Sequence, residues 1–255
     1  MKTIIITLTF FVLADNLLFA QQARFVTSGT IEYEKTVNMY AVIKKDMDDD
    51  DNTFEKMAFE AYQKNNPQFK KLKSTLTFGN NKSLFTPVVP EDASRKMGDV
   101  YADQINITYT DIANGTNIIH KEVYDEGYLI KDSVRKIKWK ITDETREIAG
   151  YTCRRANGLI MDSVYVVAFY TNKIPVFGGP ESFNGLPGMI LGVSLPHENM
   201  TWFATKVTDV PIPPAAVVPP KKGKVMNRKQ VYDELKDVMK NWGKSGPYEL
   251  KIFLL

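Results

Sequence analysis

The chain has 255 residues, of which 44% are hydrophobic and 25% charged, and its formal net charge is +3. This hydrophobic content is enough for a packed core, and the length suits one domain. Because positive and negative charges are well mixed along the chain, nucleic acid is excluded as the main partner.

Residues 1–20 have the organisation of a secretory signal peptide. A lysine precedes an apolar run over residues 4–13, and the small Ala20 comes directly before Gln21. This order predicts cleavage after Ala20, so the mature protein would begin at Gln21. Asp15 interrupts the apolar segment, which is also shorter than the roughly 20 apolar residues of a membrane span.

Export has consequences for the rest of the chain. We expect a soluble protein of the periplasm, or one associated with the outer membrane, without a transmembrane segment in the mature chain. No cysteine lies near the cleavage site, so we do not expect a lipoprotein. We expect residues 21–255 to form one domain. The single cysteine, Cys153, cannot form an internal disulfide, and we expect a buried, reduced thiol without a catalytic role.

Most of the mature chain alternates apolar and polar residues, as half-buried strands do. Strands are expected over residues 30–39, 72–78, 82–88, 105–112, 117–124, 128–133, 136–142, 163–171, 189–195 and 200–207. Turn residues separate several of them, at Gly79-Asn80-Asn81, Asn114-Gly115, Glu126-Gly127 and Pro196 to Asn199. Strands joined by short turns are normally antiparallel neighbours, so we expect a meander.

Two amphipathic helices interrupt the strands. The first is expected over residues 52–66, after an acidic run at 48–51 that would cap its N-terminus. Its apolar face would consist of Phe54, Met57, Ala58, Ala61 and Tyr62. The second is expected over residues 226–243, with an apolar stripe formed by Val231, Leu235, Val238, Met239 and Trp242.

A proline-rich connector over residues 211–220 precedes the second helix, and residues 248–255 are expected to add a last strand. A large sheet needs cover for its apolar face, and the two helices are the available cover. The predicted fold is mainly β, a curved antiparallel sheet or open barrel with two amphipathic helices packed on its concave face.

No motif of catalysis, metal binding or cofactor binding is found. The acidic run at 48–51 lacks the glycine and distal glutamate of a calcium loop. His120 and His197 lie in different elements and do not form a zinc-ligand cluster. The Gly-x-Ser-x-Gly nucleophile motif is missing, so we predict no catalytic residue, no metal and no cofactor.

Residues 178–193, GGPESFNGLPGMILGV, combine glycines and prolines with an apolar run. A phosphate-binding loop is excluded, because no Lys-Ser or Lys-Thr follows the last glycine of the loop. Leu186-Pro187-Gly188-Met189 predicts a type II turn, with a positive φ at Gly188. We therefore expect a rigid corner that presents Phe183 and Leu186 at a rim, where they serve either burial in the core or contact with a partner.

This stretch resembles the signature of the GLPGLI family of exported Bacteroidetes proteins. The residues that match are Tyr170, Thr171, Ile174, Pro175, Gly179, Pro180, Phe183, Gly185, Leu186, Pro187 and Gly188. An upstream segment matches as well, at Ile148, Gly150, Tyr151, Cys153 and Ala156. Phe169 and Met189 depart from the usual tryptophan and leucine. The family has no established biochemical activity, so the resemblance implies kinship and not a reaction.

We expect an exported, non-catalytic envelope protein that binds an apolar ligand or a membrane-protein partner. Partner contact is expected at Tyr170, Pro175, Pro180, Phe183, Gly185, Leu186, Pro187 and Gly188. One alternative is a hydrolase that uses dispersed carboxylates; another is a structural accessory of a TonB-dependent outer-membrane transporter. A ligand carrier should have an apolar cavity, a hydrolase a cleft with clustered carboxylates, and an accessory an exposed apolar patch.

Overall fold

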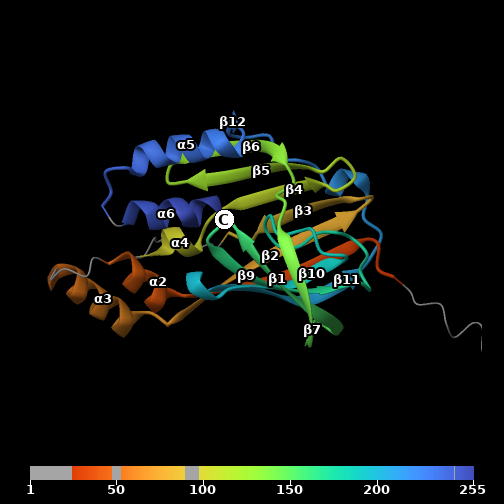
Figure 1. Ribbon diagram of the computed structural model, residues 1–255, viewed down its shortest axis with the longest axis horizontal. Helices are drawn as coiled ribbons and strands as arrows, with labels where there is room; N and C mark the ends of the chain where they lie inside the picture. The colour runs from red at the N-terminus through yellow and green to blue at the C-terminus, as the bar shows by residue number, and fades with distance from the viewer. Residues whose placement is uncertain (1–24, 48–52, 90–97, 244) are drawn as a thin grey trace, which may run out of the picture.

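The computed structural model describes residues 25–47, 53–89, 98–243 and 245–255. Within these residues one sheet of twelve strands forms the body of the protein (Figure 1). Its strands are β1 (Gly29–Asn38), β2 (Phe69–Gly79), β3 (Lys82–Pro87), β4 (Asn106–Asp111), β5 (Thr116–Val123), β6 (Glu126–Ser133), β7 (Lys138–Ile148), β8 (Tyr151–Ile160), β9 (Val164–Thr171), β10 (Met189–Leu195), β11 (Met200–Asp209) and β12 (Lys224–Met226). Neighbouring strands are antiparallel except β12 and β6, which are parallel. The predicted mainly-β class is confirmed.

The sheet is strongly curved, and its strand order shows why. Strand β1 lies inside the sheet between β2 and β11, β6 is next to one edge and β7 is the opposite edge. In a flat sheet with a spacing of about 4.8 Å, β6 and β7 would lie about 48 Å apart. Residues 134–137 join the two strands, and such a short segment spans at most about 18 Å. The sheet therefore bends round on itself, in agreement with the predicted curved sheet or open barrel.

Three of the four predicted turns are confirmed. The backbone φ is +52° and +57° at Asn80-Asn81, between β2 and β3, and +62° at Gly115, between β4 and β5. Asn199 has φ +58° and lies between β10 and β11. The turn predicted at Glu126-Gly127 is wrong by two residues. The positive φ is at Tyr124, and β6 already begins at Glu126.

The helices are α2 (Met39–Asp46), α3 (Thr53–Asn65), α4 (Asp99–Ala102), α5 (Arg228–Met239) and α6 (Ser245–Leu254), with two 3₁₀ segments, η1 (Pro196–Glu198) and η2 (Pro214–Ala216). Asn227 and Gln230 cap α5 by reciprocal hydrogen bonds between side chain and backbone. Helix α5 packs on β6 and α6, with Val231, Leu235 and Met239 buried. This helix was predicted, although Val238 and Trp242 of the expected stripe are largely exposed.

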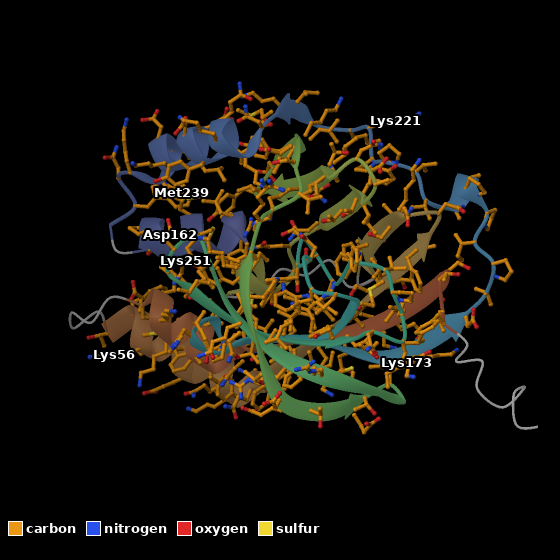
Figure 2. All side chains as sticks on the ribbon, turned by 45° about the vertical axis from the view of Figure 1, so that its right-hand side comes forward. Lys56, Asp162, Lys173, Lys221, Met239 and Lys251 are labelled. Atoms are coloured by element: carbon orange, nitrogen blue, oxygen red, sulfur yellow. The ribbon has the colours of Figure 1, made fainter. Side chains whose placement is uncertain are left out.

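The first predicted helix exists as α3, but it does not cover the sheet. It packs on α2, where the ring of Tyr40 contacts those of Phe59 and Tyr62. Of the predicted apolar face only Tyr62 is buried, whereas Phe54 and Met57 are 79% and 64% exposed. In Figure 2, Lys56 of α3 lies at the opposite end of the molecule from Lys173. The acidic run at 48–51 lies outside the described residues.

Helix α6 is the second helix, after α5, that covers the sheet. Its residues from 248 onward were predicted to form a strand. Tyr248 and Ile252 are buried at a spacing of one helical turn, and Phe253 is buried beside them. A short apolar run fits a strand or a buried helix equally well by sequence, which is why the strand prediction at 248–255 is wrong. Apart from η2, the connector at 211–220 has no helix or strand, as predicted. The signal peptide 1–20, with Ala20 and Gln21, lies outside the described residues.

The buried apolar side chains form two clusters. The larger cluster includes residues of β1–β3, β8–β11, α2 and the segment that joins β9 to β10. The smaller one lies between β5, β6, α5 and α6, and contains Ile119, Ile130, Val231, Leu235 and Phe253. The smaller cluster borders the cavity described below.

Candidate functional site

Residues 172–188, which join β9 to β10, carry the glycine- and proline-rich motif, and we call them the motif loop. Phe183 and Leu186 are 3% and 2% exposed, and Tyr170 at the end of β9 is buried as well. The ring of Phe183 packs against that of Trp202, with centroids 5.9 Å apart. Phe183 and Leu186 therefore belong to the core, and their expected presentation at a rim is wrong.

The other motif residues divide between interior and surface. Pro180 and Gly188 are buried, whereas Pro175, Gly185 and Pro187 are exposed. Contact between a partner and these three exposed residues stays a prediction.

The turn at Pro187 is tighter than the predicted type II turn. The N–H of Gly188 donates to the carbonyl of Leu186 at 2.8 Å, and a bond over two residues is that of a γ-turn. Gly188 has φ +146°, and a Cβ there would lie 2.1 Å from the carbonyl oxygen of Thr171. Glycine is needed at 188 because the neighbouring backbone passes so close, in addition to the positive φ that the turn predicts.

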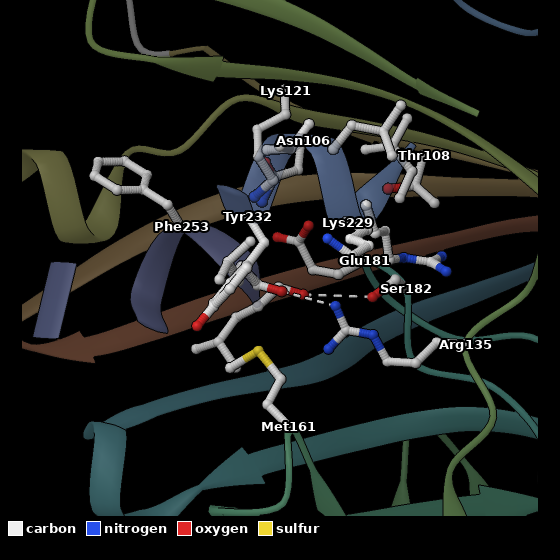
Figure 3. A pocket seen from close by; sticks show the side chains of 16 residues that line it. Asn106, Thr108, Lys121, Arg135, Met161, Glu181, Ser182, Lys229, Tyr232 and Phe253 are labelled. Atoms are coloured by element: carbon white, nitrogen blue, oxygen red, sulfur yellow. Dashed lines mark hydrogen bonds between the residues drawn. The ribbon is translucent and has the colours of Figure 1, made fainter. Parts of the chain in front are cut away.

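A cavity of about 390 Å³ lies where the motif loop, the sheet and the two C-terminal helices meet (Figure 3). Its apolar lining is Ile119, Ile130, Met161, Val231, Tyr232, Phe253, Leu254 and Leu255. Its polar lining is Asn106, Thr108, Lys121, Arg135, Glu181, Ser182, Arg228 and Lys229. The exposed Tyr232 and Lys229 of α5 lie at its mouth. Its volume lies within the range of about 300–1,000 Å³ typical of small-molecule sites.

Two neighbouring strands form the floor of the cavity. Asn106 of β4 pairs directly with Lys121 of β5, and Thr108 pairs with Ile119. Side chains two residues apart in a strand point to the same face, so Ile119, Lys121 and Val123 all point inward. The alternation of β5 therefore places a lysine among apolar side chains.

Two cations in the cavity lack part of their hydrogen bonding. Lys121 is 5% exposed, and its Nζ has no hydrogen-bond partner. Arg135 donates from Nη2 to the carbonyl of Leu254 at 2.7 Å, but its buried Nη1 has no partner. Burial lowers the pKa of Lys121 to about 8 and that of Arg135 to about 10. An unpaired buried cation is costly, so these two side chains need an explanation.

One acidic side chain faces these cations. Glu181 reaches the cavity from the motif loop, and Figure 3 shows it between Lys121 and Arg135. Burial raises the pKa of Glu181, while Lys35 and Lys121 oppose that shift. Lys35 itself is satisfied elsewhere, because its Nζ donates to the carbonyl of Ala102 at 2.9 Å and lies 5.0 Å from the ring centre of Trp202. The side chains of the cavity therefore hold more positive than negative charge.

Arg228, at the start of α5, is compensated by its own partners. Its Nη1 donates to the carbonyl of Ser133 at 2.7 Å and lies 3.9 Å from the carboxylate of Asp132. The uncompensated charge of the cavity is therefore that of Lys121 and Arg135.

A second hollow, of about 380 Å³, lies against the outer side of the motif loop. It is lined by Thr110, Ile112, Gly115, Val134, Phe177, Asn184, Gly185, Leu186 and Pro187. Phe177 is 52% exposed beside Gly185 and Pro187. This surface combines exposed motif residues with an apolar side chain.

Cys153 is a free thiol in β8 and is fully buried, as predicted. Burial raises its pKa to about 12, so it is protonated at neutral pH. The absence of a catalytic role stays a prediction.

The two histidines lie apart in the structure. His120, on β5, contacts the carbonyl of Lys222 at 3.0 Å through Nδ1, and the ring of His197 lies by Tyr165. Within the described ranges no group of three or more histidine, cysteine or acidic residues is arranged to hold a metal ion.

Sequence reasoning missed Lys121, Arg135 and Glu181. The signal for Lys121 was present, because it stands at even spacing between Ile119 and Val123 in a predicted strand. Arg135 follows a strand and Glu181 lies in a loop, so no periodicity marks either of them. Only the packing of β6, the motif loop and α6 brings them together.

Comparison with protein families finds a similarity over part of the chain. Residues 158–192, which include the motif loop, match a family described as "Protein of unknown function (Porph_ging)". No curated protein matches the chain significantly.

Solved structures resemble the fold. The chain superimposes on PNGF-II in two crystal forms, with TM-scores of 0.51 and 0.50 and sequence identities of 16% and 15%. These matches cover 86% and 81% of this chain but 34% and 32% of PNGF-II, so the chain spans about a third of that protein. An uncharacterized conserved protein from Thermus thermophilus matches with 7% identity and a TM-score of 0.39, over 84% of this chain and 98% of that one. At these identities the likeness to PNGF-II shows that the fold is shared. It does not indicate which activity this chain has.

Among the helices that the structure describes, none is both long and apolar enough to cross a membrane.

Proposed function

We propose that this protein binds a small, largely apolar molecule in the cavity between the sheet, α5 and α6. The observation that carries the proposal is a cavity of about 390 Å³ lined mainly by aliphatic and aromatic side chains. Side chains around a cavity of this size make fewer packing contacts than side chains in a close-packed core. A small apolar ligand would supply such contacts.

The proposal extends to the setting of the protein. The signal-peptide pattern and the resemblance to the GLPGLI family support an exported binding protein of the cell envelope. The binding role ranks ahead of a hydrolase, because Glu181 is the single acidic side chain among the described residues that line the cavity.

A calorimetric titration with decanol tests the proposal, because this probe is apolar and uncharged. We expect saturable binding by the parent protein and loss of binding by Val231→Phe, since Val231 is buried at the cavity wall. Val238→Phe is the matched control, on the same helix but 56% exposed, and should bind as the parent does. Ile130→Phe blocks the cavity from the sheet side if Val231→Phe does not fold.

Two results would overturn this role. One is a parent protein that binds neither decanol nor the corresponding acid, decanoate. The other is equal binding by the two valine variants when both have the thermal midpoint of the parent.

A second function is favoured by the hollow outside the motif loop. Phe177, Gly185 and Pro187 are exposed there. An accessory protein that contacts a membrane-protein partner would use such an exposed apolar surface. Phe177→Ser should reduce co-purification of an envelope partner from the native membrane without lowering the thermal midpoint. Leu159→Ser, at an equally exposed apolar residue of β8, serves as the control.

A further inference from the structure

We propose that the ligand of the cavity carries a single acidic head group, a carboxylate, which accepts hydrogen bonds from Nζ of Lys121 and Nη1 of Arg135 while an alkyl chain fills the apolar part. This inference rests on the proposed binding role and names the class of its ligand. It is drawn from two cationic side chains of the lining, Lys121 and Arg135, each of which has a buried nitrogen without a hydrogen-bond partner.

The first argument is unmet hydrogen bonding. Lys121 of β5 faces the cavity and is 95% buried. Its Nζ has no hydrogen-bond partner, and neither has Nη1 of Arg135. Both groups can only donate, so they need an acceptor. A carboxylate offers two oxygens and forms charge-assisted hydrogen bonds with both kinds of donor.

The second argument is the balance of charge. Lys121 and Arg135 line the cavity with buried nitrogens that have no partner, and Glu181 is the single acidic side chain among the described residues of its lining. The side chains of the described lining therefore carry a net positive charge, which one ligand carboxylate would reduce. Glu181 would repel a doubly charged head group, which favours a carboxylate over a phosphate.

The third argument is the arrangement of the lining. Ser182 lies next to Glu181 in the motif loop, and its hydroxyl already donates to the main-chain oxygen of Leu255 at 3.4 Å (Figure 3). The same lining includes Ile119, Ile130, Val231 and Phe253, which offer no polar partner. A cavity that combines buried cations with apolar side chains suits an amphipathic molecule and not a uniformly apolar one.

The experiment compares decanoate, decanol and decylamine, which differ only in the head group. We expect the parent protein to bind decanoate at least about tenfold more tightly than decanol, and decylamine more weakly than either. Lys121→Met should lower the affinity for decanoate roughly tenfold more than the affinity for decanol, because only decanoate loses a charge-assisted hydrogen bond. Glu181→Gln should shift the preference in the opposite direction, because it removes the competing carboxylate.

The matched control is Lys131→Met, which removes the same charge from β6 at an exposed position. It should leave all three affinities unchanged, which separates a specific contact from the general effect of net charge. Arg135→Met is the second variant and should also weaken decanoate binding. If Arg135→Met does not fold, Lys121→Met still decides the matter.

The outcomes separate the two proposals. If neither decanol nor decanoate binds, the cavity is not a ligand site and the proposed function fails. If decanol and decanoate bind equally, or if Lys121→Met and Lys131→Met lower decanoate affinity equally, the acidic head group is refuted while the apolar site stands.

Discussion

The two buried regions of this protein differ in how completely they are packed. Around the motif loop, Leu186, Met189 and Ile190 are at most 2% exposed, and the backbone at Gly188 leaves no room for a Cβ. Between β5, β6 and α5 the core instead leaves a cavity and encloses Lys121 without a partner. The first region is organised for stability, whereas the second gives up stability, as the proposed binding site would require.

The largest expected effect comes from the packed region. Gly188→Val would place a Cβ against the carbonyl oxygen of Thr171 and force a β-branched residue to a positive φ. We expect a loss of unfolding free energy on the order of 5 kcal/mol, or failure to fold. Urea melts would measure it.

The control for this variant is Gly115→Val, where φ is +62° and no atom lies within 4 Å of a built Cβ. Its cost should be limited to backbone strain of roughly 1–2 kcal/mol. Equal stability of the two variants would contradict the close approach at Gly188.

The next largest effect is expected at Leu186. Leu186→Ala removes a core side chain that is 2% exposed, and should cost roughly 2–5 kcal/mol of unfolding free energy. Leu159→Ala, at a side chain that is 56% exposed, should cost well under about 1 kcal/mol. A small loss at both positions would mean that the motif loop is not part of the core.

Lys121→Met should act in the opposite direction and stabilise the protein by roughly 1–3 kcal/mol below about pH 8. The pKa of Lys121 is lowered to about 8 in the folded state by burial, so folding penalises its protonated form. As pH rises above about 8, folded Lys121 loses its proton while the unfolded lysine keeps it, and the penalty disappears. The advantage of Lys121→Met should therefore shrink between about pH 8 and about pH 10.5.

Thermal melts of both proteins at several pH values would measure this change. A gain that does not depend on pH would mean that packing, and not the charge of Lys121, sets the difference.

A smaller effect is expected on ligand affinity. Between about pH 7 and about pH 9 decanoate stays ionised while Lys121 loses its proton, so its binding should weaken by several-fold. The other charged groups that act on Lys121 are Glu181, Arg135 and Lys35. Decanol is the control, and its affinity should not follow pH. Decanoate binding that strengthens with pH would exclude protonated Lys121 as its partner.

The smallest effect is expected outside both regions. Met57 of α3 is 64% exposed and faces away from the sheet, so Met57→Ser should change the unfolding free energy by less than about 0.5 kcal/mol. The equivalent change in the smaller cluster, Leu235→Ser, should cost several times more because Leu235 is 3% exposed. A large loss at Met57 would show that α3 packs against something besides α2.

The sequence by itself determined those features that depend on local chemistry. Alternation along the strands is set by the two-residue period, and the turns at Asn80-Asn81 and Gly115 are set by residues that tolerate positive φ. The helix at α5 was predictable because its apolar spacing and its cap are both local. Glycine at 188 was predictable for the same reason, although the type of turn was not.

The tertiary structure decided what each face of these elements meets. The amphipathic pattern of α3 predicted a helix but did not show whether it would pack on α2 or on the sheet. The apolar run of α6 fitted a strand as well as a buried helix. The cavity depends on Lys121, Arg135 and Glu181 meeting from three segments distant in sequence. No local pattern encodes such a meeting, because it follows from the curvature of the sheet and from the way α5, α6 and the motif loop close over it.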